Sequence, residues 1–373
     1  MNTTMSQLPP EHVADDSVLW TPTNLGAIAL PHRLAMAPMT RDRSASDGSP
    51  TDMNVEYYRQ RASTAVIITE GTQPSADGQG YLVTPGIYTD EHVAGWARVI
   101  DAVHQAGGRI IVQLMHVGRI SHPDNTPHHR QPVAPSAVAP HTEMFTSQGL
   151  VPIPEPRALS LTEVQTTVDD FRHAAACAMR AGADGVEIHG ANGYLVHQFL
   201  SSNANRRSDA YGGSIPNKIR FAVEVAEAVA DEIGADRTGI QISPGNPFND
   251  VVEDDMRQLY GALISALAPL GLAYLNVSFG DDGLRRTLGK AFGGPVVLNR
   301  AGASVVERTA DLASGLADVI TVGTRTLANP DIVERIRTGA TLNAPDKDTF
   351  YGGDERGYTD YPTLSQLVAG SDA

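Results

Sequence analysis

Residues 160–188, SLTEVQTTVDDFRHAAACAMRAGADGVEI, contain the unit that decides the fold. Ser160 and Glu163 form the pattern of a helix capping box, after which apolar residues recur at steps of four and three until Gly182. A short apolar run, Val186–Ile188, follows. Such β-branched runs are typical of strands that helices cover on both faces of a parallel sheet. The stretch therefore predicts a helix followed by a buried strand.

The same unit recurs along the chain. The short apolar runs number eight: Leu34–Ala37, Ala65–Ile68, Ile110–Leu114, Val186–Ile188, Ile240–Ile242, Tyr274–Val277, Val296–Leu298 and Val319–Val322. Further helices are expected over residues 90–106, 216–234, 253–267, 304–313 and 330–337. Eight strand–helix units predict an α/β fold, a (β/α)8 TIM barrel. The alternative, a doubly wound open sheet, is disfavoured because neither GxGxxG nor GxxxxGK[ST] occurs.

One connection is longer than the others. Residues 121–157 lie between the third and fourth expected strands and contain eight prolines and four histidines. In barrels, lids and substrate walls are built from loops that follow the strands. We therefore expect a single domain over residues 1–373, with residues 121–157 as an inserted loop or lid subdomain.

The composition excludes several classes of partner. The 28 basic and 43 acidic residues give a net charge of −15, which repels nucleic acid and anionic membranes. No stretch reaches the roughly 18 apolar residues of a membrane helix. The single Cys177 cannot form an internal disulfide, and the first thirty residues lack a signal-peptide pattern, so a cytoplasmic location is expected. His122, His128 and His129 match no tight ligand spacing, so no metal site is expected.

Polar residues and glycines follow the expected strands. In a barrel, these positions meet at one mouth. The set comprises Thr40, Gly71, Gln113, His189, Asn192, Tyr194, Gln241, Gly323 and Thr324. Side chains that donate and accept hydrogen bonds without strong nucleophilicity suit the binding of a large planar polar ligand. The sequence thus predicts a cofactor site at the barrel mouth.

Six motifs, in order, resemble the old yellow enzyme family. They are MAPMTR (36–41), EYYRQRA (56–62), QLMHVGR (113–119), HGANGY (189–194), Asn205 with YGGS (211–214), and YGG (351–353) with GYTDYP (357–362). The resemblance implies an FMN-dependent (β/α)8 enzyme that takes hydride from NADPH or NADH. It also implies reduction of carbon–carbon double bonds activated by carbonyl or nitro groups. The expected partners are small electron-poor alkenes, and the expected state is a monomer or homodimer.

The resemblance assigns cofactor-binding roles within these motifs. Thr40 is similar to the threonine that bonds the flavin O4 edge, and Gln113 to the glutamine on the flavin pyrimidine. Gly71 resembles the small residue whose backbone approaches the ring. Pro38 and Met39, from the same motif as Thr40, complete this part of the expected cofactor site.

The resemblance also implies substrate and catalytic residues. His189 and Asn192 are similar to the pair that binds the carbonyl or nitro oxygen of the substrate, and Tyr194 to the proton donor. The positions expected to surround the substrate are Tyr81, Tyr351 and Met115, the last in place of a common tryptophan.

The chain departs from the family at two charged positions. Gln241 stands where the family usually has an arginine near flavin N1, and Thr324 where it has a phosphate-binding arginine. The residues expected to compensate near the phosphate are Arg300, Gly302, Gly323 and Arg325. Because a neutral amide supplies no positive charge, the reduced flavin should be less stabilised. The alternative hypothesis is therefore a flavin or deazaflavin binding protein or reductase with altered cofactor use.

Overall fold

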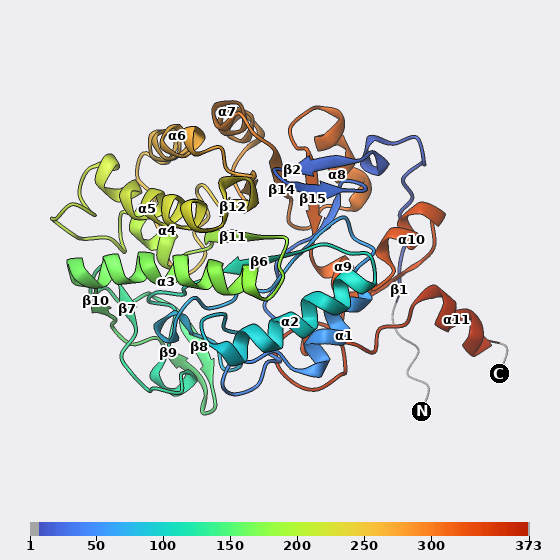
Figure 1. Cartoon of the computed structure of the whole chain (residues 1–373), viewed down its shortest axis with the longest axis horizontal. Helices are drawn as coiled ribbons and strands as arrows, with labels where there is room; N and C mark the ends of the chain where they lie inside the picture. The colour runs from blue at the N-terminus through green and yellow to red at the C-terminus, as the bar shows by residue number, and fades with distance from the viewer. Residues whose placement is uncertain (1–6, 372–373) are drawn as a thin grey trace.

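Eight parallel strands close into a barrel in the computed structural model, which describes residues 7–371. Figure 1 shows the strands inside a layer of helices. The strands are β4 (Leu34–Met36), β5 (Ile67–Ile68), β6 (Ile110–Leu114), β11 (Gly185–Gly190), β12 (Thr238–Ile242), β13 (Tyr274–Val277), β14 (Val296–Asn299) and β15 (Val319–Val322). They are arranged around the barrel in chain order, and β15 pairs with β4 to close it. The predicted (β/α)8 TIM barrel is confirmed.

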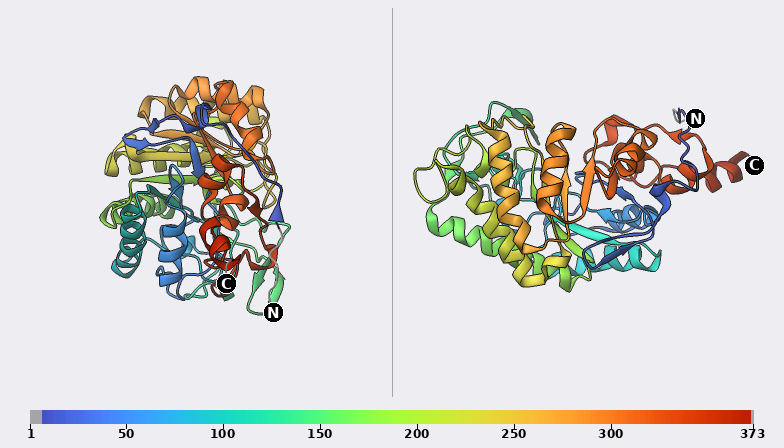
Figure 2. Two further views of the ribbon diagram at one scale, coloured as in Figure 1. Left: turned by 90° about the vertical axis from the view of Figure 1, so that its right-hand side faces the viewer. Right: turned by 90° about the horizontal axis from the view of Figure 1, so that it is seen from above.

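Helices cover the outside of the barrel (Figures 1 and 2). They are α1 (Asp52–Gln60), α2 (Asp90–Gln105), α3 (Leu161–Arg180), α5 (Ile215–Ile233), α6 (Met256–Leu267), α7 (Asp282–Phe292), α8 (Val305–Ala313) and α10 (Ile332–Thr338). As predicted, α3 begins with a capping box: the backbone N–H of Ser160 donates to the Glu163 carboxylate at 2.8 Å, and the Ser160 hydroxyl accepts from the N–H of Glu163 at 3.3 Å.

Some helix boundaries differ from the prediction for physical reasons. Helix α6 begins at Met256 rather than Glu253, because the Glu253 carboxylate instead accepts hydrogen bonds from the backbone N–H of Gly245 and from His197. Helices α1 and α7 were not predicted. Helix α7 buries few apolar residues among charged ones, so its apolar stripe is narrow.

An N-terminal hairpin closes one end of the barrel. Its strands are β2 (Thr23–Leu25) and β3 (Ile28–Leu30). The turn requires glycine at position 26, where φ is 56°. A Cβ atom added there would lie only 2.1 Å from the carbonyl oxygen of Asp236. The hairpin packs Leu25, Ile28 and Leu30 against buried residues from the start of the barrel strands. Because this end is filled with apolar side chains, a ligand must enter from the opposite end.

The inserted segment forms a small β structure. Its strands are β7 (Val133–Ala134), β8 (Glu143–Thr146) and β9 (Gly149–Pro152), and β7 pairs with β10 (Arg157–Ala158). Met144 and Ile153 of this segment join a buried cluster with Met115 and Tyr194, which follow β6 and β11. The segment therefore lies against the barrel mouth. Its function as a lid stays a prediction.

Short elements complete the chain. They are β1 (Gln7–Leu8), which pairs with β16 (Leu342–Asn343), and the helices α4 (Leu195–Leu200), α9 (Thr324–Ala328) and α11 (Leu364–Ser371). Figures 1 and 2 show α11 projecting from the side of the barrel. Within residues 7–371, we find no helix with the length and apolarity required to cross a bilayer.

Candidate active site

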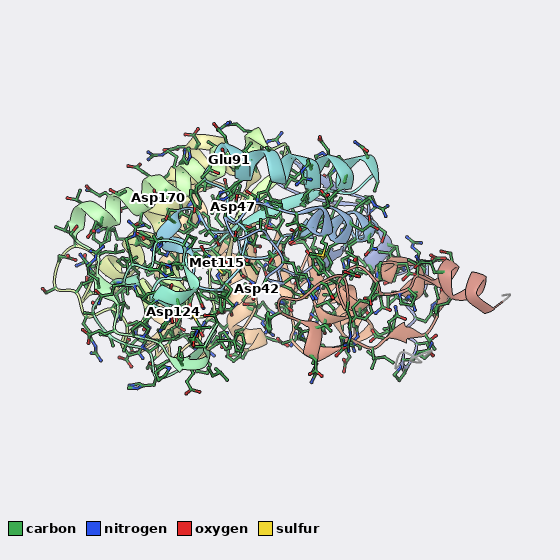
Figure 3. The ribbon with its side chains drawn as sticks, turned by 90° about the horizontal axis from the view of Figure 1, so that it is seen from below. Asp42, Asp47, Glu91, Met115, Asp124 and Asp170 are labelled. Atoms are coloured by element: carbon green, nitrogen blue, oxygen red, sulfur yellow. The ribbon has the colours of Figure 1, made fainter. Side chains whose placement is uncertain are left out.

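A pocket of about 410 Å³ opens at the C-terminal ends of the barrel strands. The predicted site residues among those lining it are Pro38, Met39, Thr40, Gly71, Gln113, Met115, His189, Asn192, Tyr194 and Gln241. Figure 3 labels Met115 near the middle of the molecule seen from below. A second cavity of about 380 Å³ lies at the opposite end, beside Gly26, and none of its lining side chains is titratable. The mouth of the barrel is therefore the candidate active site.

Two glutamines in the pocket have fixed amide orientations. Gln113 Nε2 donates to Glu187 Oε1 at 2.8 Å and to Gln241 Oε1 at 3.0 Å. These bonds leave Gln113 Oε1 as an acceptor and Gln241 Nε2 as a donor for a ligand. The pocket can therefore bind a planar ring edge that carries both an N–H and a carbonyl group.

His189 and Asn192 both present hydrogen-bond donors. The backbone N–H of Ala191 donates to His189 Nδ1 at 3.2 Å, so the neutral imidazole carries its proton on Nε2. Burial lowers the pKa of His189 to about 3, which keeps the ring neutral. Asn192 Oδ1 accepts from Asn246 Nδ2 at 2.9 Å, so the Nδ2 group of Asn192 remains for a ligand. The pair is suited to hold an oxygen atom.

Two tyrosine hydroxyl groups meet beside this pair. The Tyr194 and Tyr81 hydroxyl oxygens are 2.8 Å apart, and the Tyr194 ring lies edge-on to His189 at a centroid distance of 5.0 Å. Burial raises the pKa of Tyr194 to about 12, so its hydroxyl stays protonated near neutral pH. Neither Tyr81 nor Tyr351 is among the residues that line the pocket. Tyr81 contacts the lining residue Tyr194, and Tyr351 is 68% exposed. Their roles in substrate binding stay predictions.

Residues 18–343 match the model of the NADH:flavin oxidoreductase / NADH oxidase family. The chain belongs to this family. A protein of Leishmania infantum named "Probable flavin mononucleotide-dependent alkene reductase" is 41% identical, and the alignment covers 93% of this chain and 98% of that protein. The 12-oxophytodienoate reductase 2 of Arabidopsis thaliana is 38% identical over 94% of this chain and 96% of its own length.

Solved structures agree with this assignment. Morphinone reductase superimposes with a TM-score of 0.90 at 42% identity, covering 95% of this chain and 98% of that structure. An old yellow enzyme homologue from Zymomonas mobilis has a TM-score of 0.89 at 38% identity, and the superposition covers 93% of this chain and 99% of that structure. The resemblance to old yellow enzymes is confirmed. The protein is an FMN-dependent oxidoreductase that acts on alkenes and takes hydride from NADH or NADPH.

The donor set of the pocket fits the FMN ring of an NADH:flavin oxidoreductase. Gln113 offers an acceptor and Gln241 a donor, which match the N–H and carbonyl groups of the flavin pyrimidine edge. Thr40 adds a hydroxyl group to the same pocket. Gly71 faces Met115. A Cβ atom added at Gly71 would lie 2.4 Å from the Met115 methyl group, so glycine is needed at position 71 for Met115 to occupy its position in the pocket.

The arginines expected near the flavin phosphate are engaged by carboxylates. Arg300 pairs with Asp311 at 2.6 Å and with Asp282 at 2.9 Å, and the Asp311 carboxylate raises its pKa. Arg325 pairs with Glu11 at 2.5 Å. The lining residues in this part of the pocket are Asn299 and Ala301 rather than either arginine.

The glycines of this region leave backbone accessible. Gly302 has a φ of 79° and open space around its Cβ position, whereas a Cβ atom at Gly323 would meet the Met39 sulfur at 3.3 Å. Thr324 begins the short helix α9 directly after Gly323. The phosphate-binding roles of Arg300, Gly302, Gly323, Thr324 and Arg325 stay predictions.

Several residues in or beside the pocket were missed by the sequence analysis. Asn246, Phe248, Phe279 and Asn299 line the pocket, and Glu187 lies beside Gln113. The signal for Glu187 was a carboxylate inside the apolar run Val186–Ile188. The other four follow or end expected strands, but nothing in their local sequence distinguishes a pocket residue from a loop residue.

Proposed function

We propose that this enzyme reduces carbon–carbon double bonds activated by a carbonyl or nitro group, with His189 and Asn192 binding the activating oxygen and Tyr194 supplying the proton. The observation that carries the proposal is the fixed direction of two neutral donors, His189 Nε2–H and Asn192 Nδ2–H, beside a protonated phenol. Bound FMN supplies the hydride that it receives from NADH or NADPH.

The oxygen-binding pair stabilises charge as it develops. When hydride adds to the alkene carbon furthest from the activating group, negative charge builds on the oxygen held by His189 and Asn192. A preorganised donor at such an oxygen contributes about 2.7–4 kcal/mol to transition-state stability. Because the His189 pKa is lowered to about 3, the imidazole acts as a neutral donor throughout the physiological pH range.

Tyr194 completes the addition. Its hydroxyl transfers a proton to the remaining alkene carbon, and the hydroxyl of Tyr81, 2.8 Å away, stabilises the phenolate that results. The proton is then replaced from solvent. Phe248, Phe279 and Met115 supply apolar walls for the rest of the substrate. In this proposal the exposed Tyr351 adds a further wall.

The flavin is held by neutral groups in this proposal. Gln113 and Gln241 would hold the pyrimidine edge, Thr40 would hold the O4 edge, and Pro38 and Met39 would contact the ring, since all five line the pocket. The phosphate would bind to backbone N–H groups of the loops that contain Gly302 and Gly323.

Tyr194→Phe tests the proposal. The rate of flavin reduction by NADPH should stay within about twofold of wild type, whereas transfer to cyclohexenone should fall by roughly 10²–10⁴-fold, the usual contribution of a general acid. Anaerobic stopped-flow measurements separate the two steps. Tyr81→Phe is the matched control, since it removes a neighbouring hydroxyl but keeps the donor, and its effect should be smaller. Equal losses in both steps of Tyr194→Phe would contradict the proposal.

A specific observation favours a second candidate, a reductase with altered cofactor use. Gln241 and Thr324 are neutral, and Arg300 and Arg325 are paired with carboxylates. The missing cations at positions 241 and 324 make a deazaflavin the alternative cofactor to FMN. Mass spectrometry of the small molecule released on denaturation distinguishes the two, because each cofactor has its own mass.

A further inference from the structure

Glu187 is a buried carboxylate directly below the flavin-binding residues. It lies in β11 with 0% of its surface exposed. Its Oε1 atom accepts from Gln113 Nε2 and its Oε2 atom accepts from Asn276 Nδ2, both at 2.8 Å. Gln113 Nε2 also donates to Gln241 Oε1 at 3.0 Å, so the carboxylate bonds Gln113 directly and is linked to Gln241 through Gln113.

The groups that face Glu187 are neutral on every neighbouring strand. They are Gln113 on β6 and Asn276 and Tyr274 on β13, while Gln241 on β12 bonds Gln113. The pKa of the Tyr274 phenol is raised far above its ordinary value, first by burial and then by Glu187, so the phenol does not ionise. Within residues 7–371, no ion pair includes Glu187; the buried and half-buried pairs join other side chains, such as His197 with Glu253 and Arg300 with Asp311. An unpaired buried carboxylate is costly, and it is stabilised when it gains a proton.

Position 241 explains the missing counter-charge. An arginine there, which the family resemblance gives as the usual residue, would place a cation near both Glu187 and the flavin. Gln241 instead has a neutral amide, whose Oε1 atom accepts a hydrogen bond from Gln113 Nε2. None of the residues that line the pocket therefore carries a fixed positive charge to balance either the carboxylate or a reduced flavin.

We propose that Glu187 binds a proton when the flavin is reduced, and that this proton replaces the missing cation. The inference rests on the proposed function, because it requires flavin at this pocket. Hydride transfer oxidises the nicotinamide and brings two electrons and one proton to the site, which leaves one added negative charge. The proton taken from solvent forms the O–H bond of the Glu187 carboxyl and neutralises that charge.

The electrostatics give the direction of the effect. Burial raises the pKa of Glu187 to about 7, and the neutral side chains of Asn276, Gln113 and Tyr274 oppose that shift. A negative charge added nearby raises the pKa further. At a pH between the pKa of Glu187 with oxidised flavin and its pKa with reduced flavin, reduction is therefore accompanied by the uptake of one extra proton at Glu187.

The midpoint potential of the FMN-loaded protein tests this inference. A two-electron couple changes by about 30 mV per pH unit for each proton taken up. Wild type should therefore become about 60 mV more negative per pH unit in the interval that begins near pH 7, instead of about 30 mV. In Glu187→Gln the slope should be about 30 mV at every pH from 5.5 to 9. The two proteins should have equal potentials at pH 5.5, and the variant the higher one at pH 9.

A second variant tests the same claim from the opposite charge state. Gln241→Arg supplies a permanent cation that keeps Glu187 ionised, so its slope should also be about 30 mV per pH unit, at a higher potential than wild type. This variant keeps the inference testable if Glu187→Gln does not fold. Asp170→Asn is the matched control, because burial also raises the pKa of Asp170, to about 6, on the outer helix α3 (Figure 3). It should retain the wild-type slope.

Two results would overturn the inference. A wild-type slope of about 30 mV per pH unit throughout means that no extra proton is bound. A steeper slope that persists in Glu187→Gln means that the proton goes to another group, such as the ring itself. Either result leaves alkene reduction intact, so the proposed function would survive. Failure of the protein to bind FMN would remove both.

Discussion

The amide of Asn192 should be controlled by Asn246, and a single substitution can reverse it. Asn246 Nδ2 donates to Asn192 Oδ1 at 2.9 Å, which leaves Asn192 Nδ2 to bind the substrate oxygen. In Asn246→Asp the carboxylate only accepts hydrogen bonds, so it pairs with Asn192 Nδ2 and turns the amide over. Asn192 Oδ1 then faces the substrate oxygen, and one of the two donors is lost.

The expected loss follows from the donor that is removed. A missing donor at a developing oxyanion costs about 2.7–4 kcal/mol, or roughly 10²–10³-fold in rate. Asn246→Ala removes only the neutral hydrogen bond that orients Asn192, worth about 0.5–1.5 kcal/mol, so its loss should be about tenfold at most. The rate of cyclohexenone reduction is measured by stopped flow after the flavin has been reduced with dithionite.

Low pH should restore part of the activity lost in Asn246→Asp. As the pH falls toward the ordinary aspartate pKa of about 3.9, Asp at position 246 gains a proton and can again donate to Asn192 Oδ1. The difference between Asn246→Asp and Asn246→Ala should therefore shrink at low pH. An aspartate variant as fast as the alanine variant at neutral pH would refute the orientation argument.

Three further predictions concern stability and cofactor affinity. The Arg157 side chain and the capping bonds lower the pKa of Glu163 to about 2. The stability that the Glu163 carboxylate adds is therefore present above pH 4.5 and is lost as the pH falls toward 2. Glu163→Gln should abolish that part of the pH dependence of unfolding, measured by chemical denaturation. Gly26→Ala places Cβ 2.1 Å from the Asp236 carbonyl oxygen at a φ of 56°, and thermal unfolding should show a loss above about 1 kcal/mol. Thr324→Arg adds the absent cation and should tighten FMN binding to the apoprotein by roughly tenfold, measured by fluorescence titration.

The barrel could be predicted because its strands are buried on both faces. The runs at Ile110–Leu114 and Tyr274–Val277 coincide with β6 and β13. Strand ends were less predictable, since Gly185 and Gly190 join β11 through pairing with β6 and β12 rather than through strand propensity. The closing hairpin was missed because its apolar residues acquire a role only when they meet the barrel end.

Positions in the active site were predictable, but their orientations were not. Gln113 could be placed at the mouth from the sequence alone. Which of its amide atoms faces the ligand depends on Glu187, which lies 74 positions along the chain. In the same way, the carboxylate that engages Arg325 belongs to Glu11, 314 positions away. Local sequence does not contain such long-range partners.

The neutrality of the ligand-facing groups has a consequence for pH dependence. His189 has a pKa lowered to about 3 and Tyr194 one raised to about 12, so neither changes protonation between pH 5 and 9. Transfer to the alkene should therefore depend on pH only through the driving force of the reduced flavin. That driving force changes with the charge of Glu187, whose pKa burial raises to about 7 and the added charge of a reduced flavin raises further. A pH-dependent rate in wild type that becomes flatter in Glu187→Gln would locate the titrating group below the flavin, rather than beside the substrate.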